Sequence, residues 1–280
     1  MSSLVFGLVA ALCWGLHDIC VRYVSQRGGI LSALTSVLII GTVILVPPAI
    51  ALGGWDTMTL GAVALAAAAG VAFFLAYIGL YHAFEIGPVR LVAPVIGAYP
   101  ILSVGWAALS GQPVPWDQWV AVGAVISGVA IVGLLTGAGE SHGNKRAAIL
   151  WAMLGGASFA ATFALGQAAA DASAEMPVIF VTRLVASLVA VALMLATGGL
   201  RWPSRGTLPM LGAMGVLDCV ALGIVIAAAG MARPEFASVA ASTFGMITVI
   251  LAWAILRERM TAGQWMGVLL TFAAIGYLAL

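Results

Sequence analysis

Charged residues are scarce in this sequence. Asp, Glu, Lys and Arg make up 8% of the 280 residues, whereas hydrophobic residues make up 63%. A soluble domain needs far more polar surface than this, so lipid must be the solvent for most of the molecule. The net charge of +1 also provides no basic surface for nucleic acid. We therefore expect a membrane protein with no nucleic-acid partner.

Cysteine and the usual catalytic motifs are also sparse or absent. Of the three cysteines, Cys13 and Cys20 are separated by about 10.5 Å along one predicted helix, which is too far for a disulfide. The sequence has no Walker loop, no Gly-x-Ser-x-Gly and no His-Glu-x-x-His. We expect no cofactor, no metal and no enzymatic activity, and this chain alone has no nucleotide site for pumping by ATP.

Apolar runs that are long enough to cross a bilayer recur along the whole chain. Gly, Pro and charged residues divide them into ten predicted helices. These cover residues 3–24, 30–52, 58–82, 88–109, 116–137, 146–169, 176–198, 206–230, 233–255 and 261–280. The loops between them are short, which excludes a separate catalytic or binding domain outside the membrane.

The longest polar stretch, GAGESHGNKR at 137–146, lies near the middle of the chain and separates five predicted helices from five. One shift of 146 places Pro234 on Pro88 and Gln264 on Gln118 (234−88, 264−118). We predict a first repeat at 1–137, a central loop at 138–145 and a second repeat at 146–280. Because each repeat has an odd number of spans, the two must be inverted in the membrane. The predicted fold is an all-α membrane protein with ten transmembrane helices in two inverted five-helix repeats.

The carboxyl-terminal segment resembles a known family. In EFASVAASTFGMITVILAWAILRERMTAGQWMGVLLTFAAIGYLAL, residues 235–280, small residues precede a helix that ends in Arg-Glu-Arg and is followed by Gly-Gln-Trp-x-Gly. This pattern resembles the ten-helix EamA-type branch of the drug/metabolite transporter superfamily, and the resemblance covers the whole chain. The first repeat departs from it, because Gln112 stands where the second has Glu258. The aromatic residues described below are most similar to those of the YddG-type aromatic amino-acid exporters.

Positive charge predicts the orientation. The loops on one side hold nine Lys and Arg residues, whereas the loops on the other side hold only Arg233. The nine are Arg22, Arg27, Arg90, Lys145, Arg146, Arg201, Arg205, Arg257 and Arg259. Cytoplasmic loops are enriched in such residues, so we predict a multi-pass protein of the cell inner membrane with both termini in the periplasm.

Four polar or charged side chains within the predicted spans are candidates for binding a solute: His17, Asp18, Arg183 and Asp218. A charge at membrane depth must be paired or hydrated, so these side chains should face the interior of the bundle. Arg183 suits a substrate carboxylate. The alternative is a structural pair of Arg183 with Asp218 or with Asp18.

Aromatic residues form a second group of candidates. Trp14 shares a helical face with Asp18, and indole together with carboxylate suits an organic cation or ammonium group. The alternative for this pair is that Asp18 lies at the membrane interface near the cytoplasmic end of its helix, with Arg22 one turn further on. The aromatic and neighbouring residues that we expect to line a pocket for flat solutes are Tyr77, Tyr81, His82, Tyr99, Phe159 and Phe163. The alternative is that the Tyr and Trp residues anchor helix ends at the membrane interface and that the Phe residues face lipid.

The fourth and ninth predicted helices form the last group. Pro94 and Pro100 each remove a backbone donor, which predicts a kink in the fourth helix. The ninth has Ser242 and Thr243, which can bind substrate or join helices. Small residues at Gly263 and Gly267, and at Gly123 and Ser127, predict packing of the fifth helix on the tenth, with a dimer interface as the alternative.

These features favour a secondary transporter that moves small organic metabolites across the membrane by alternating access. The family resemblance implies export and favours amino acids, aromatic ones first. The alternatives are a proton-coupled exporter of drugs or organic cations, an intramembrane enzyme that uses Asp18 and Asp218, and a sensor or scaffold. The expected partners are a small-molecule solute and the lipid bilayer, and we expect a monomer with a homodimer as the alternative.

Overall fold

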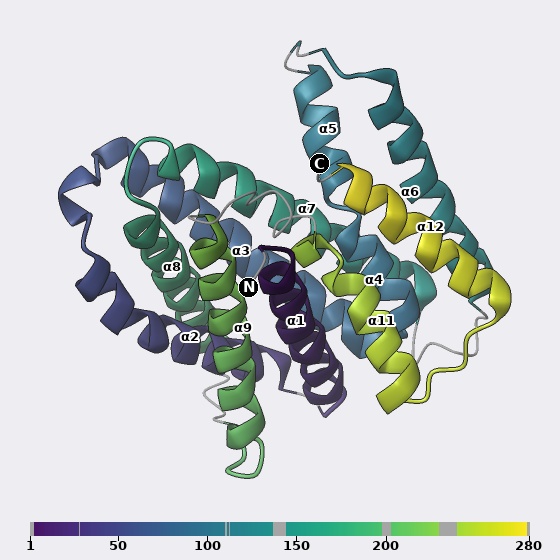
Figure 1. Ribbon diagram of the computed structural model, residues 1–280. Helices are drawn as coiled ribbons and strands as arrows, with labels where there is room; N and C mark the ends of the chain where they lie inside the picture. Colours follow the sequence, from purple (N-terminus) through teal and green to yellow (C-terminus); the bar gives the residue numbers. More distant parts are fainter. Residues whose placement is uncertain are drawn as a thin grey trace.

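The computed structural model describes residues 3–27, 29–109, 111, 113–136, 144–197, 203–229 and 240–278, and every element in this part of the chain is helical. Figure 1 shows the helices packed side by side as a bundle. They are α1 Ser3–Ser25, α2 Ile30–Leu52, the short η1 Trp55–Thr57, α3 Leu60–Ile86, α4 Val89–Gly97, α5 Pro100–Leu109, α6 Trp116–Leu135, α7 Lys145–Ala170, α8 Glu175–Ala196, α9 Leu208–Ala229, α11 Phe244–Ile255 and α12 Ala262–Leu278.

The ten predicted spans all correspond to apolar helices. Six helices, α1, α2, α3, α6, α7 and α8, are each long and apolar enough to cross a membrane. The other four spans correspond to the shorter apolar stretches Val89–Leu102, Leu208–Leu222, Ala240–Ile255 and Ala262–Leu278. The all-α membrane fold is therefore confirmed. The predicted ends at residues 137, 198, 230, 233 and 280 lie outside the described residues, as do residues 233–239 of the predicted ninth helix.

The third helix differs most from its prediction. We expected it to end at residue 82, but α3 continues to Ile86 and ends where Gly87 and Pro88 follow. Polar His82 and Glu85 lie at the predicted end and just beyond it. Both belong to the carboxyl-terminal part of the helix, where His82 Nδ1 is 3.2 Å from Glu85 Oε2. The mutual contact satisfies both side chains, so neither has to end the helix.

The fourth span breaks where the prolines predicted a kink. α4 ends at Gly97 and α5 begins at Pro100. The ninth span breaks at the matching place, because Thr243 forms a turn before α11 and stands 146 residues after Gly97 (243−97). The second repeat has no proline here, so the break is a property of both repeats and does not depend on proline alone.

The contacts between helices are equivalent in the two repeats. α3 packs on α7 as its counterpart α9 packs on α1, and α4 packs on α7 as α11 packs on α1. The pairs α2 with α8, α4 with α11 and α6 with α12 each join one helix to its own counterpart. Exchanging the two repeats therefore maps the packing onto itself, as expected for two inverted five-helix units.

The predicted packing of the fifth span on the tenth is correct, but one of the two small-residue patterns is wrong. A Cβ on Gly267 of α12 would lie 2.8 Å from the carbonyl oxygen of Gly128 on α6. Gly123 has no atom within 4 Å of its ideal Cβ, and it is exposed together with Ser127. Gly128, one residue beyond the predicted pair, therefore allows the close approach, because it lies on the face of α6 that meets α12.

One end of the bundle carries the basic turns, and we call it the basic end. It holds the carboxyl ends of α1, α3 and α11 and the amino end of α4. A hydrogen bond of Arg22 joins α1 to the end of α3, and a hydrogen bond to Glu258 joins α4 to the turn after α11. In Figure 1 the carboxyl ends of α1 and α11 point towards the bottom of the view. At the other end, Thr57 after α2 accepts a hydrogen bond from the backbone of Ala174, at 2.8 Å.

Candidate functional site

An ion pair lies at the centre of the bundle. Arg183 on α8 donates from Nη2 to Oδ2 of Asp218 on α9. The side chains are 5% and 8% exposed, so the pair is shielded from solvent and lipid. Trp14 Nε1 on α1 donates to Asp218 Oδ1 at 3.1 Å, and the Tyr77 hydroxyl on α3 donates to Oδ2 at 3.1 Å. One carboxylate thus joins four helices from both repeats, and the pairing satisfies the requirement of a buried charge.

A second carboxylate, Asp18, lies in a different setting. It accepts a hydrogen bond from the Thr248 hydroxyl of α11 at 3.0 Å, and its Oδ1 is 3.6 Å from Nδ1 of the preceding His17. α1 and α11 approach closely here, since a Cβ on Gly15 would lie 3.3 Å from the backbone nitrogen of Thr248. Asp18 therefore links α1 to the broken ninth span, and its partners are a hydroxyl and an imidazole.

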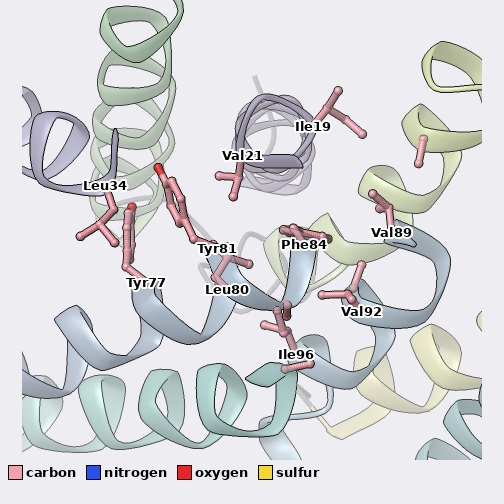
Figure 2. Close-up of a cluster of buried hydrophobic side chains, with 14 of the residues drawn as sticks. Ile19, Val21, Leu34, Tyr77, Leu80, Tyr81, Phe84, Val89, Val92 and Ile96 are labelled. Atoms are coloured by element: carbon pink, nitrogen blue, oxygen red, sulfur yellow. The ribbon is translucent and has the colours of Figure 1, made fainter. Parts of the chain in front are cut away.

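Aromatic rings continue the site from the ion pair. The guanidinium of Arg183 lies 5.3 Å from the ring centroid of Phe73 on α3, and this ring is 4.7 Å from that of Tyr77. The rings of Tyr77 and Tyr81 are stacked at 6.0 Å, and Figure 2 shows both rising from α3 towards α1 and α9. The row extends through α7 to the turn before α5 by way of three further contacts: Tyr77–Phe159 at 6.4 Å, Phe159–Phe163 at 6.3 Å and Tyr99–Phe163 at 5.4 Å.

Three buried polar atoms around this row have no hydrogen-bond partner among the described residues. They are His17 Nε2, the Tyr81 hydroxyl and Arg183 Nη1. Buried polar groups are almost always hydrogen-bonded, so unpaired ones indicate a place for a ligand or water. Gly41 of α2 makes room for the guanidinium, because a Cβ there would lie 2.6 Å from Nη1. We refer to Trp14, His17, Asp18, Tyr77, Tyr81, Arg183 and Asp218 as the central cluster.

A comparison with family models identifies the family of this chain. The model of the EamA-like transporter family matches the chain twice, at residues 1–134 and 146–280. The chain belongs to the EamA-like transporter family. Its two matches coincide with the two halves that exchange under the packing described above. A solved structure described only as the crystal structure of a protein has the same fold, with a TM-score of 0.63 and 16% identity over 98% of this chain and 94% of the other. No curated protein matches.

Some predicted residues of this EamA-like transporter lie away from the central cluster. His82 stacks on Trp151 of α7 at 4.6 Å, near the basic end. It lines a separate open pocket of about 430 Å³ with Ile30, Leu31 and Leu193. The helical period explains this position, because His82 is one residue beyond Tyr81 and so points about 100° away from it around α3. Figure 2 shows Tyr81 directed towards α1 and α9.

The predicted residues of the ninth span and two of the aromatic residues lie at the margin. The Thr243 hydroxyl donates to the carbonyl of Ala240 at 2.6 Å, so it holds the turn before α11, and Ser242 in the same turn is half-buried. Phe163 is 52% exposed, as expected for a ring at the edge of the row, and Tyr99 is half-buried.

The sequence prediction missed two members of the site. Phe73 precedes Tyr77 by one helical turn, so the spacing of Phe73, Tyr77 and Tyr81 was a usable signal for one continuous aromatic face. Thr248 was not among the predicted site residues, yet its hydroxyl donates to Asp18. No sequence signal identifies that pairing, because the two residues are 230 positions apart.

Proposed function

We propose that this EamA-like transporter is a secondary transporter that exports small organic metabolites, amino acids and above all aromatic ones, from the bacterial cell by alternating access. The observation that carries the proposal is the Arg183–Asp218 ion pair at the centre, with aromatic rings beside it. The orientation follows the distribution of loop charge, which favours a cytoplasmic basic end and periplasmic termini in the inner membrane.

The ion pair is complementary to a zwitterion. When Arg183 and Asp218 separate, each needs a new partner of opposite charge, because an unpaired buried charge is costly. The α-carboxylate and α-ammonium of an amino acid supply both in one molecule. A substrate with a single charge satisfies only one of the two and leaves the other unpaired. The unpaired Nη1 of Arg183 provides the second donor for a bidentate contact with the carboxylate.

The row of rings favours an aromatic side chain on the substrate. Phe73, Tyr77 and Phe159 present ring faces and edges within 7 Å of one another, the range in which aromatic groups attract each other. The hydroxyl of Tyr81 is buried and unpaired, so it can bind a polar atom of the ring, such as an indole N–H or a phenol. This arrangement supports an aromatic amino acid over an aliphatic one.

The second candidate is a proton-coupled exporter of organic cations. Asp18 favours it, because its described partners are Thr248 and His17, so this carboxylate can take a proton or a cationic group without breaking an ion pair with arginine. An intramembrane aspartate enzyme fits less well. Such a dyad shares one proton between two carboxylates, whereas Asp218 is occupied by Arg183, Trp14 and Tyr77.

Three ligands of matched shape test the proposal. Purified protein in liposomes loaded with unlabelled tryptophan should take up labelled tryptophan by exchange. Tryptamine, which lacks the carboxylate, and indole-3-propionate, which lacks the ammonium group, should exchange at least about tenfold more slowly, since each leaves one charge unpaired. Tryptamine exchange equal to that of tryptophan would establish the organic-cation alternative. No exchange of any amino acid would refute the proposal.

A further inference from the structure

The turn between α3 and α4 at the basic end is held by opposite charges on its two sides. Arg22 of α1 donates to the carbonyls of Phe84 and, at 2.9 Å, Gly87 at the carboxyl end of α3. Glu258, in the turn between α11 and α12, accepts from the backbone nitrogens of Val89 at 2.8 Å and Arg90 at 3.1 Å. Each charge lies at the helix end whose dipole it complements.

Glu258 takes the place of a missing helix cap. α4 follows Pro88, which gives no side-chain cap, so its first backbone N–H groups need another acceptor. The carboxylate provides it and also lies 3.4 Å from Nη1 of Arg90. The carboxylate belongs to the second repeat and the capped helix to the first. Arg22, by contrast, belongs to the same repeat as the α3–α4 turn, so it can move together with that turn.

The backbone beside Glu258 is in an uncommon conformation. Arg257 has a φ of 55°, the one positive value among the non-glycine residues that the structure describes. This left-handed residue turns the chain at the end of α11 and directs Glu258 back to α4. Residues held in such conformations cluster at functional and switching positions.

A dry layer lies between the central cluster and this turn. Val21 of α1, Phe84 of α3 and Val89 of α4 are fully buried, and Figure 2 shows them between α1, α3 and α4. Val249 and Ala252 of α11 are also fully buried. Within the part of the chain that the structure describes, these packed apolar side chains separate the central cluster from the basic end.

We propose that Glu258 is a gating residue, whose bond to the amino end of α4 holds the basic end of the transport path closed and is released when that end opens. This rests on the proposed transport function and adds to it a site of control. Another polar link between the repeats in this region, Gln264 to the carbonyl of Leu135 at 3.3 Å, joins α12 to α6. Those two helices meet at Gly267 and Gly128. Neither of them contributes a residue to the central cluster.

The test measures access to the dry layer and needs no substrate. Val21→Cys is placed in a background in which Cys13, Cys20 and Cys219 are replaced by alanine. In detergent, its buried thiol should react slowly with a water-soluble maleimide. Glu258→Gln, which removes the charge, should accelerate labelling by about tenfold, since it weakens two backbone hydrogen bonds. Glu258→Asp, which keeps the charge on a shorter side chain, should produce a smaller acceleration.

Glu85→Gln is the matched control. It removes one carboxylate charge at the same end, but the Glu85 side chain is 41% exposed and pairs with His82 within α3. Labelling should therefore stay at the parent rate. Equal labelling of parent and Glu258→Gln would overturn the proposal, as would equal acceleration by Glu85→Gln. Failure of both Glu258 variants to fold would also overturn it, because a bond that opens in every cycle cannot be required for folding.

Flux measurements separate this inference from the proposed function. Accelerated labelling of Glu258→Gln, with no amino-acid exchange in the parent protein, would support the gate and refute the proposed transport of amino acids. Normal exchange with unchanged labelling in Glu258→Gln would keep the function and refute the gate. If both inferences hold, Glu258→Gln should also change the balance between loading at the two sides, which efflux and uptake rates report separately.

Discussion

Replacing Arg183 by glutamine tests whether the central ion pair is a substrate site or only a structural link. The change leaves Asp218 as a buried carboxylate whose described donors are Trp14 and Tyr77. Removing one partner of a buried pair typically costs about 3–5 kcal/mol. Because two neutral donors remain, we expect the lower end of this range, about 3 kcal/mol of unfolding free energy.

The double variant Arg183→Gln/Asp218→Asn separates charge pairing from transport. It leaves no unpaired charge, and buried pairs often only offset their own desolvation, so we expect a cost of about 1 kcal/mol. The two changes should therefore be non-additive by at least about 2 kcal/mol. Exchange of tryptophan should still be lost, since the neutral amides of glutamine and asparagine do not replace the two charges that bind the zwitterion.

Reversible unfolding of the purified protein in mixed micelles and exchange in liposomes measure the two effects. Ser187→Ala is the control, because Ser187 joins α8 to Thr42 of α2 through a neutral hydrogen bond of 2.8 Å. It should cost about 1 kcal/mol and keep transport. Full exchange by a stable double variant would show that the pair is only structural. Equal stability of the single and double variants would refute the argument from buried charge.

Four further predictions follow from the structure. Asp18→Asn should reduce flux and change its pH dependence, since a carboxylate that bonds a hydroxyl and an imidazole is replaced by a group that does not titrate; an unchanged pH profile would exclude Asp18 as a proton carrier. Tyr81→Phe should leave stability unchanged or raise it by up to about 1 kcal/mol, because the lost hydroxyl has no described partner, while KM for tryptophan rises. Gly79→Val should destabilise by about 1–3 kcal/mol, because its Cβ would lie 2.7 Å from Cα of Gly155, whereas Gly166→Ala, with open space around it, should be tolerated. Fusions at the carboxyl terminus should give active alkaline phosphatase and dark green fluorescent protein, and the opposite pair would reverse the proposed orientation.

The sequence predicted the helices well because the information for them is local. A span requires a run of apolar residues about as long as the bilayer is thick, and glycines, prolines and charges mark its ends. Pro94 and Pro100 indicated the break in the fourth span for the same reason. The predicted end of α3 was wrong by four residues (86−82). The contact between His82 and Glu85 allows polar side chains near the end of the helix, and the sequence alone does not show this contact.

The partners of the polar residues could not be predicted in the same way. The sequence left Arg183 with either Asp18 or Asp218, and the tertiary structure pairs it with Asp218. The choice depends on how α1, α8 and α9 are rotated about their axes. In helices that are apolar on nearly every side, hydrophobic periodicity does not define that rotation.

By itself, the sequence determined that this chain is an all-α membrane protein built from two halves, because the cost of polar groups in lipid acts on each segment separately. Only the tertiary structure decided that Asp218 accepts from three helices, that Thr248 binds Asp18 and that Glu258 caps α4. These contacts join residues far apart in the chain. Their geometry is fixed by helix packing, and no run of neighbouring residues contains it.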